Sequence, residues 1–189
     1  MAHSRTAPSP VARALRSTSP ARLAGLVLAL TLALLTGTAR AAEALPPPEG
    51  EVVLTLRGGI SRHNAGTEAQ FDLALLQALP QTSFATSTVW TDGVSTYSGV
   101  LLRDLLAAVG AEGSRLTATA IDGYQITIPL QELGEDGPIV AHLRDGAPMP
   151  VRERGPLWII FPFDDNPAFR NDTTYARSIW QLTLIEIED

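Results

Sequence analysis

The chain has 189 residues, with 14 arginines, no lysine, 20 acidic residues and no cysteine, so that no disulfide can hold the fold together. All 20 acidic residues but only nine of the arginines follow residue 41, and that part of the chain therefore carries a net charge of 9 − 20 = −11. A charge this negative opposes binding to phosphate backbones and to anionic lipid surfaces, which argues against a nucleic-acid partner.

Residues 1–41 are predicted to be a secretory signal peptide. Arg13, Arg16 and Arg22 precede an apolar core at residues 23–35, and Ala39-Arg40-Ala41 is a small-residue cleavage site, so cleavage is expected before Ala42. The apolar core is shorter than the roughly 20 residues that span a bilayer, which disfavours an uncleaved anchor. We expect a periplasmic or secreted protein with no membrane span after cleavage.

Residues 42–50 are predicted to be a Pro-rich linker, and residues 51–189 a single domain. Pro46-Pro47-Pro48 favours a stiff, extended spacer. The chain after residue 41 is long enough for one sizeable core, and it contains no internal repeat or second shift in composition.

Short strands and a few helices follow the linker. Strand composition predicts β-strands at residues 52–56, 83–91, 116–121, 124–128, 139–143, 157–161 and 180–187. Apolar residues at helical spacing predict helices over residues 71–79 and 101–109, with Gly110 as the C-terminal cap of the second. Strands and helices that do not alternate regularly indicate an α+β domain with mixed β-sheets.

Two of these strands have distinctive features. Asp122-Gly123 separates residues 116–121 from residues 124–128 and predicts a tight hairpin in which both turn residues have positive φ. Residues 157–161 are apolar on both faces, as expected for a central, buried strand.

Several short motifs occur in a specific order. They are Gly99-Val100-Leu101-Leu102-Arg103-Asp104-Leu105-Leu106, Asp122-Gly123-Tyr124, Asp145-Gly146-Ala147-Pro148, Gly155-Pro156-Leu157 and Ile179-Trp180. In this order the chain resembles, over residues 52–187, the molybdopterin-binding domain of sulfite-oxidase-type oxidoreductases. The resemblance implies that family's mixed α+β fold, a molybdopterin cofactor and a metal held by one cysteine thiolate, a soft ligand that suits such a metal.

The chain departs from that family where the cofactor would be held. The resemblance places the cysteine position about a dozen residues before Gly99, near Ser87, where only hydroxyl side chains occur. Trp158 stands where relatives often have an arginine, and Ile179 where they often have a lysine, so two cations that would suit a pterin phosphate are missing. The predicted leader also lacks an Arg-Arg pair, which indicates export of an unfolded chain without a cofactor.

A ligand pocket is still expected. The residues in or beside the segments that would surround the pterin cleft are Ser87, Trp90, Asp92, Tyr124, Arg154, Trp158 and Tyr175. Aromatic rings with an arginine suit a small planar or anionic ligand, whereas Trp180 is expected to pack in the core. The sequence predicts no catalytic residue and no metal site: it has no Gly-x-Ser-x-Gly elbow, and neither histidine after residue 41 has a second ligand at useful spacing.

Three functions remain open. The first is an exported, non-catalytic module that binds a small ligand or acts as an accessory, with no cofactor. The second is an active molybdopterin-dependent oxidoreductase with a non-cysteine metal ligand such as Ser87. The third is a periplasmic sensory or interaction partner of a membrane sensor or a redox protein.

Overall fold

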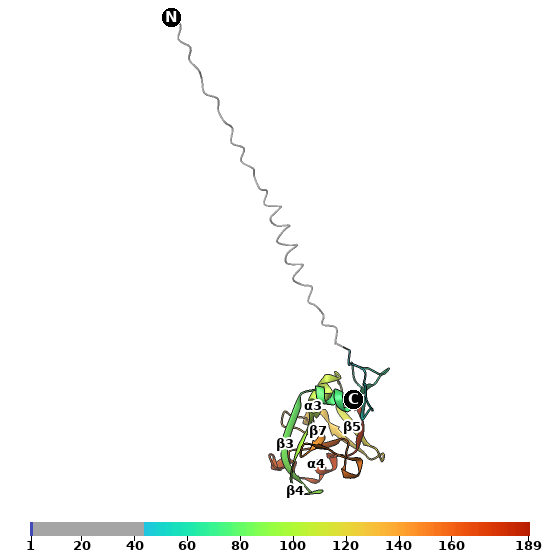
Figure 1. Ribbon diagram of the computed structural model, residues 1–189, viewed down its shortest axis with the longest axis vertical. Helices are drawn as coiled ribbons and strands as arrows, with labels where there is room; N and C mark the ends of the chain where they lie inside the picture. Colours follow the sequence, from blue (N-terminus) through green and yellow to red (C-terminus); the bar gives the residue numbers. More distant parts are fainter. Residues whose placement is uncertain (2–43) are drawn as a thin grey trace. The chain divides into compact units, whose positions relative to one another are not determined.

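The computed structural model describes Met1 and residues 44–189, and the predicted signal peptide, apart from Met1, lies outside the described residues. Residues 44–189 belong to one compact unit (Figure 1). Within this described part of the chain, no helix is long and apolar enough to cross a membrane.

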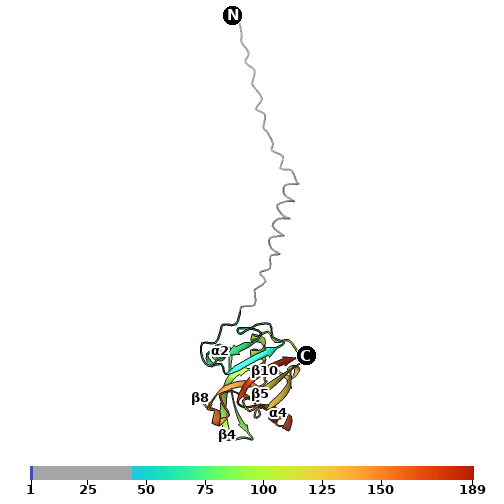
Figure 2. The ribbon, with the colours of Figure 1, turned by 90° about the vertical axis from the view of Figure 1, so that its right-hand side faces the viewer.

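Two five-stranded sheets form the domain (Figures 1 and 2). The first sheet contains, in spatial order, β2 (Ala69–Phe71), β1 (Leu54–Gly58), β10 (Leu182–Glu188), β5 (Arg115–Ala120) and β6 (Gln125–Pro129). The second contains β3 (Gln81–Thr88), β4 (Thr91–Leu101), β7 (Ile139–Arg144) and β8 (Ala147–Pro148), with β9 (Trp158–Ile160) also paired to β7. The pair β1–β10 is parallel and joins the two ends of the domain, whereas the other pairs are antiparallel.

Three short α-helices connect these strands: α2 (Leu73–Ala78), α3 (Leu102–Ala108) and α4 (Asp172–Arg177). Side-chain caps begin two of them, since Asp72 accepts a hydrogen bond from the Leu75 amide and Asn171 accepts one from the Thr174 amide. Three single turns of 3₁₀-helix complete the elements of residues 44–189: η1 (Leu130–Glu132), η2 (Val151–Glu153) and η3 (Pro167–Phe169).

One hydrophobic cluster joins both sheets and α3. The alternation in β5 buries Leu116 and Ala118 on one face, as the strand period requires. Leu105 of α3 is fully buried, so the apolar stripe of this helix faces the core as expected. Gly110, at φ +60°, follows α3 where the sequence predicted its cap. The mixed α+β architecture is therefore confirmed.

One long strand escaped prediction. Residues 92–100 lie outside every strand predicted from the sequence, but they belong to β4. The glycine and aspartate content of β4 is untypical of a strand, but Gly99 has a physical reason there. A Cβ on Gly99 would lie 2.1 Å from the Val140 carbonyl oxygen, so only glycine lets β4 approach β7 this closely. The sequence analysis also missed β2, β8 and α4.

The predicted hairpin between β5 and β6 is confirmed, but its turn differs from the expected one. Gly123 has φ +86°, while Asp122 is not among the non-glycine residues with positive φ. The Gly123 amide donates to the Ala120 carbonyl at 3.0 Å and the Ala120 amide donates to the Tyr124 carbonyl at 2.9 Å. This is the pattern of a three-residue loop with a glycine bulge.

The described part of the Pro-rich segment is attached to the domain. The Asn64 side-chain amide donates to the Pro46 carbonyl at 2.8 Å. The amides of Glu49 and Gly50 donate to one carboxylate oxygen of Asp72 at 2.9 and 2.7 Å. These contacts fix the segment against the start of α2.

Candidate functional site: an aromatic pocket

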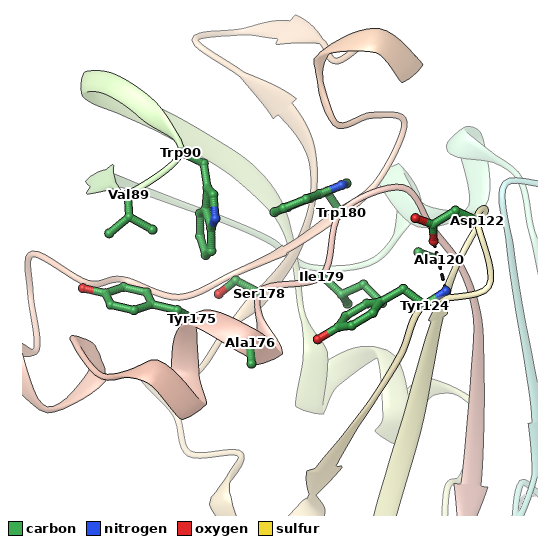
Figure 3. Close-up of a pocket in the computed structure, with 10 residues that line it drawn as sticks. All are labelled: Val89, Trp90, Ala120, Asp122, Tyr124, Tyr175, Ala176, Ser178, Ile179 and Trp180. Carbon is green, nitrogen blue, oxygen red and sulfur yellow. Dashed lines mark hydrogen bonds between the residues drawn. The ribbon is translucent and has the colours of Figure 1, made fainter.

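Aromatic side chains surround a pocket of about 390 Å³, a volume within the range of small-ligand sites. The pocket lies between the β3–β4 turn, the β5–β6 turn and the segment from α4 to β10. Figure 3 shows Trp90 and Tyr175 on one side, Tyr124 and Asp122 on the other, and Trp180 between them. The lining residues are Val89, Trp90, Ala120, Asp122, Tyr124, Tyr175, Ala176, Ser178, Ile179 and Trp180.

Trp90 is the centre of the aromatic group. Its ring centroid lies 5.6 Å from that of Trp180 and 5.9 Å from that of Tyr175, with the rings at 74° and 86°. Such edge-to-face contacts are the favoured geometry for aromatic pairs. The turn that presents Trp90 is held by Thr88, whose hydroxyl oxygen accepts hydrogen bonds from the amides of Trp90 and Thr91.

Trp158 supports the pocket from behind. It is fully buried, its indole N–H donates to the Ser178 carbonyl at 3.0 Å, and its ring lies 5.9 Å from that of Trp90. A β-bridge pairs Trp158 with Trp180, so this part of β9 fixes the start of β10. The strand predicted at residues 157–161 is thus buried as expected, although only three of its residues form β9.

Arg154 lies beside the pocket without lining it. It has φ +74° at the end of η2, and its carbonyl accepts the Gln181 amide at 3.1 Å. Its guanidinium carbon is 5.6 Å from the centroid of Trp158 and 5.4 Å from that of Trp180. These distances are within the reach of a cation–π interaction.

Asp122 is the charged residue of the pocket lining. One of its carboxylate oxygens accepts the Tyr124 amide at 3.0 Å, which orients the side chain at the β5–β6 turn (Figure 3). Asp122 forms no ion pair with any residue that the structure describes.

Ser87 lies outside the pocket lining, at the end of β3. Its hydroxyl donates to one carboxylate oxygen of Asp164 at 2.7 Å and its amide donates to the other at 2.8 Å. Arg170 also pairs with Asp164. The two hydrogen bonds from Ser87, together with Arg170, hold the pKa of Asp164 below its ordinary value. The Ser87 hydroxyl is thus engaged as a donor to a carboxylate.

The structure brings together most of the predicted site residues. Trp90, Tyr124 and Tyr175 line the pocket, while Trp158 and Arg154 pack around it. The exposed side chain of Asp92 does not line it.

The sequence analysis missed Trp180, which was expected in the core. Ile179 is buried and Trp180 is half-buried, and both line the pocket.

Residues 64–163, more than half of the chain, match the family described as oxidoreductase molybdopterin binding domain. The chain belongs to this family. The sulfane dehydrogenase SoxCD from Paracoccus pantotrophus has a similar structure, with a TM-score of 0.54 and 18% sequence identity. The match covers 72% of this chain but only 38% of the SoxCD chain, so it supports the molybdopterin-binding fold and not the activity. No curated protein matches the chain in sequence.

The residues of this family member do not fit a molybdenum centre. The whole chain has no thiol, and the Ser87 hydroxyl at the expected ligand position is bonded to Asp164. The described residues contain no group of three or more histidine, cysteine or acidic side chains that could hold a metal ion. The pocket lining offers a carboxylate where an anionic pterin phosphate would need cations.

Proposed function

We propose that this protein is an exported, non-catalytic module that binds a small ligand in the aromatic pocket and keeps the fold of a molybdopterin-binding domain. The observation that carries this proposal is the bonded state of Ser87 beside a pocket lined by Trp90, Tyr175 and Trp180. Ser87, at the position where the family has its metal-binding residue, is hydrogen-bonded to Asp164. The neighbouring pocket is free to bind a small molecule.

The pocket has the properties of a small-molecule site. Its walls are mainly apolar and aromatic, and the hydroxyls of Tyr124 and Tyr175 add polar groups that can orient a ligand. All three tryptophans of the chain lie in or against this site. Core packing alone accounts for the buried Trp158, but not for the half-buried Trp90 and Trp180.

The second candidate is an active molybdopterin-dependent oxidoreductase, and the family description favours it. Such an enzyme needs Ser87, or another oxygen, as the metal ligand. To serve in this way the Ser87 hydroxyl would have to lose its proton and its hydrogen bond to Asp164, while that carboxylate would remain beside the new alkoxide. The like charges would repel each other, so the geometry supports the binding module better.

A role as a sensory or interaction partner is compatible with the binding module. Exposed apolar side chains gather near the pocket, with Val89 62%, Ile121 60% and Tyr124 50% exposed. When a ligand fills the pocket, an exported module can present these exposed side chains to a membrane sensor or a redox protein. The charge of −11 after residue 41 makes nucleic acid an unsuitable partner.

Analysis of the protein purified from its own host tests the proposal. Molybdenum is measured by mass spectrometry of metals, and pterin by fluorescence after oxidative release. We expect neither in stoichiometric amount, whereas a cysteine-containing member of the family, prepared in parallel, should contain both. One molybdenum per chain would overturn the binding-module proposal and establish the enzyme.

A further inference from the structure

We infer that the ligand of the aromatic pocket is an organic cation, an ammonium group on a small apolar body, rather than an anion. This inference rests on the proposed binding function and specifies its ligand class. It is carried by three observations: the charge of the pocket lining, the faces of its aromatic rings and the behaviour of Arg154.

The lining favours positive charge. Of the ten lining residues, Asp122 alone is charged, and it has no ion-pair partner in the described part of the chain. The Tyr124 amide orients the Asp122 carboxylate without neutralising its charge. A ligand ammonium would supply the missing counter-charge, whereas a ligand anion would meet repulsion here.

The rings favour positive charge as well. Trp90 lies at 74° to Trp180 and at 86° to Tyr175, and all three side chains line the pocket (Figure 3). The face of an aromatic ring is the negative end of its quadrupole and attracts cations. Tyr124 closes the opposite side, next to Asp122.

Arg154 shows that these indoles accept a cation. Its guanidinium lies over Trp158 and Trp180 at 5.6 and 5.4 Å from their centroids. Arg154 is not among the residues that line the pocket, and its guanidinium lies against the two indoles instead. The arginine that was expected to bind an anionic ligand therefore contacts the tryptophans, and its charge would repel a bound cation.

Three matched probes test the inference: benzyltrimethylammonium, benzyl alcohol and benzoate, which share a phenyl ring and differ in charge. Because all three tryptophans belong to the site, intrinsic fluorescence reports binding at the pocket. We expect benzyltrimethylammonium to bind about tenfold or more tightly than benzoate, with benzyl alcohol between them.

Two variants with opposite expected effects make the test specific. Asp122→Asn should weaken benzyltrimethylammonium binding about three- to tenfold and leave benzyl alcohol unchanged, because only the charged probe loses a partner. Arg154→Gln should leave binding of that cation equal or tighter, because a nearby positive charge is removed. Asp92→Asn is the matched control, since Asp92 is an exposed carboxylate outside the pocket.

The outcomes separate the two proposals. Tighter binding of benzoate, or its loss in Arg154→Gln, would overturn the cation inference while leaving a working pocket. Absence of binding by all three probes would also overturn it, and the molybdenum and pterin content would then decide the proposed function by itself. An equal loss of cation binding in Asp122→Asn and Asp92→Asn would show a general charge effect and count against a site at Asp122.

Discussion

At the scale of single residues, substitutions of Ser87 and of Trp158 are expected to differ most in their cost to stability. Ser87→Ala removes one side-chain hydrogen bond, and Asp164 keeps the Ser87 amide and Arg170 as partners. We expect a cost of about 0.5–1.5 kcal/mol in the free energy of unfolding and unchanged ligand binding. Trp158→Ala empties a fully buried site and should cost about 3–5 kcal/mol.

Urea titrations of the two variants measure these costs, with probe binding recorded on the folded protein. Loss of binding in Ser87→Ala at wild-type stability would show that the hydroxyl serves the ligand. A cost for Trp158→Ala as small as that for Ser87→Ala would contradict the supporting role of this tryptophan.

The sequence predicted which segments lie near the pocket better than it predicted which of their side chains line it. Trp90, Tyr124 and Tyr175 were found from their positions beside the motifs, and they do line the pocket. Ser87 and Asp92 occupy the same hairpin as Trp90, but their side chains lie outside the pocket lining. The register shift between Ser87 and Thr88 changes which residues face the pocket, and a shift of this kind has no local sequence signal.

At the scale of elements, the β5–β6 turn positions Asp122 and Tyr124 and depends on Gly123. This glycine has φ +86°, yet a Cβ there would touch nothing within 4 Å. Gly123→Ala should therefore lower the free energy of unfolding by about 1–2 kcal/mol through backbone conformation alone. Gly134→Ala is the matched control, because Gly134 has equal space without a positive φ.

Thermal and urea unfolding of both glycine variants provide the measurement. We expect Gly134→Ala to be neutral or slightly stabilising, since it restricts the unfolded chain. Similar losses in the free energy of unfolding for both variants would contradict the expectation that the positive φ of Gly123 makes its substitution costly.

The sequence predicted those elements whose periodicity is local. The stripe of α3 and the alternation of β5 are confirmed because burial on one face selects such patterns. The three-residue β2 and the glycine-containing β4 were missed, since pairing with β1 and β7 stabilises strands that their own length or composition does not predict. The parallel pair β1–β10 depends on contacts between distant segments, which no local pattern reveals.

At the scale of the whole molecule, His142 should make stability depend on pH near neutrality. The Gln81 amide nitrogen donates to two backbone carbonyls, so its oxygen faces the His142 Nε2, which must carry the proton. The His142 Nδ1 is buried and has no hydrogen-bond partner among the described residues, and burial lowers the pKa of this histidine from 6.5. The unfolded chain then takes up the proton first, so stability should fall as pH drops below about 6.5.

Two carboxylates should add a second loss of stability at lower pH. Hydrogen bonds from the Leu75 and Gly50 amides lower the pKa of Asp72, and those from Ser87 lower the pKa of Asp164, both from 3.8. A lowered pKa gives stability above the unfolded value that is lost as pH falls through the folded value. Urea unfolding at about pH 8, 5 and 3 should separate the two losses of stability. His142→Leu should reduce only the loss between about pH 8 and 5. A stability curve that is level down to about pH 4 in the wild type would contradict the role of His142.

The last feature at this scale is the expected cleavage before Ala42, with which the contacts of residues 44–50 are compatible. Pro46, Glu49 and Gly50 bond to Asn64 and Asp72, so a cut before Ala42 leaves every described contact of the segment in place. We expect the intact mass of the exported protein to correspond to residues 42–189. A chain that begins at Glu51 should be less stable than one that begins at Ala42, since Asp72 would lose the two amides of Glu49 and Gly50 while keeping its bond to Leu75. Equal melting temperatures for the two chains would show that the segment is a spacer after all, and an exported mass that retains residues 1–41 would refute the cleavage.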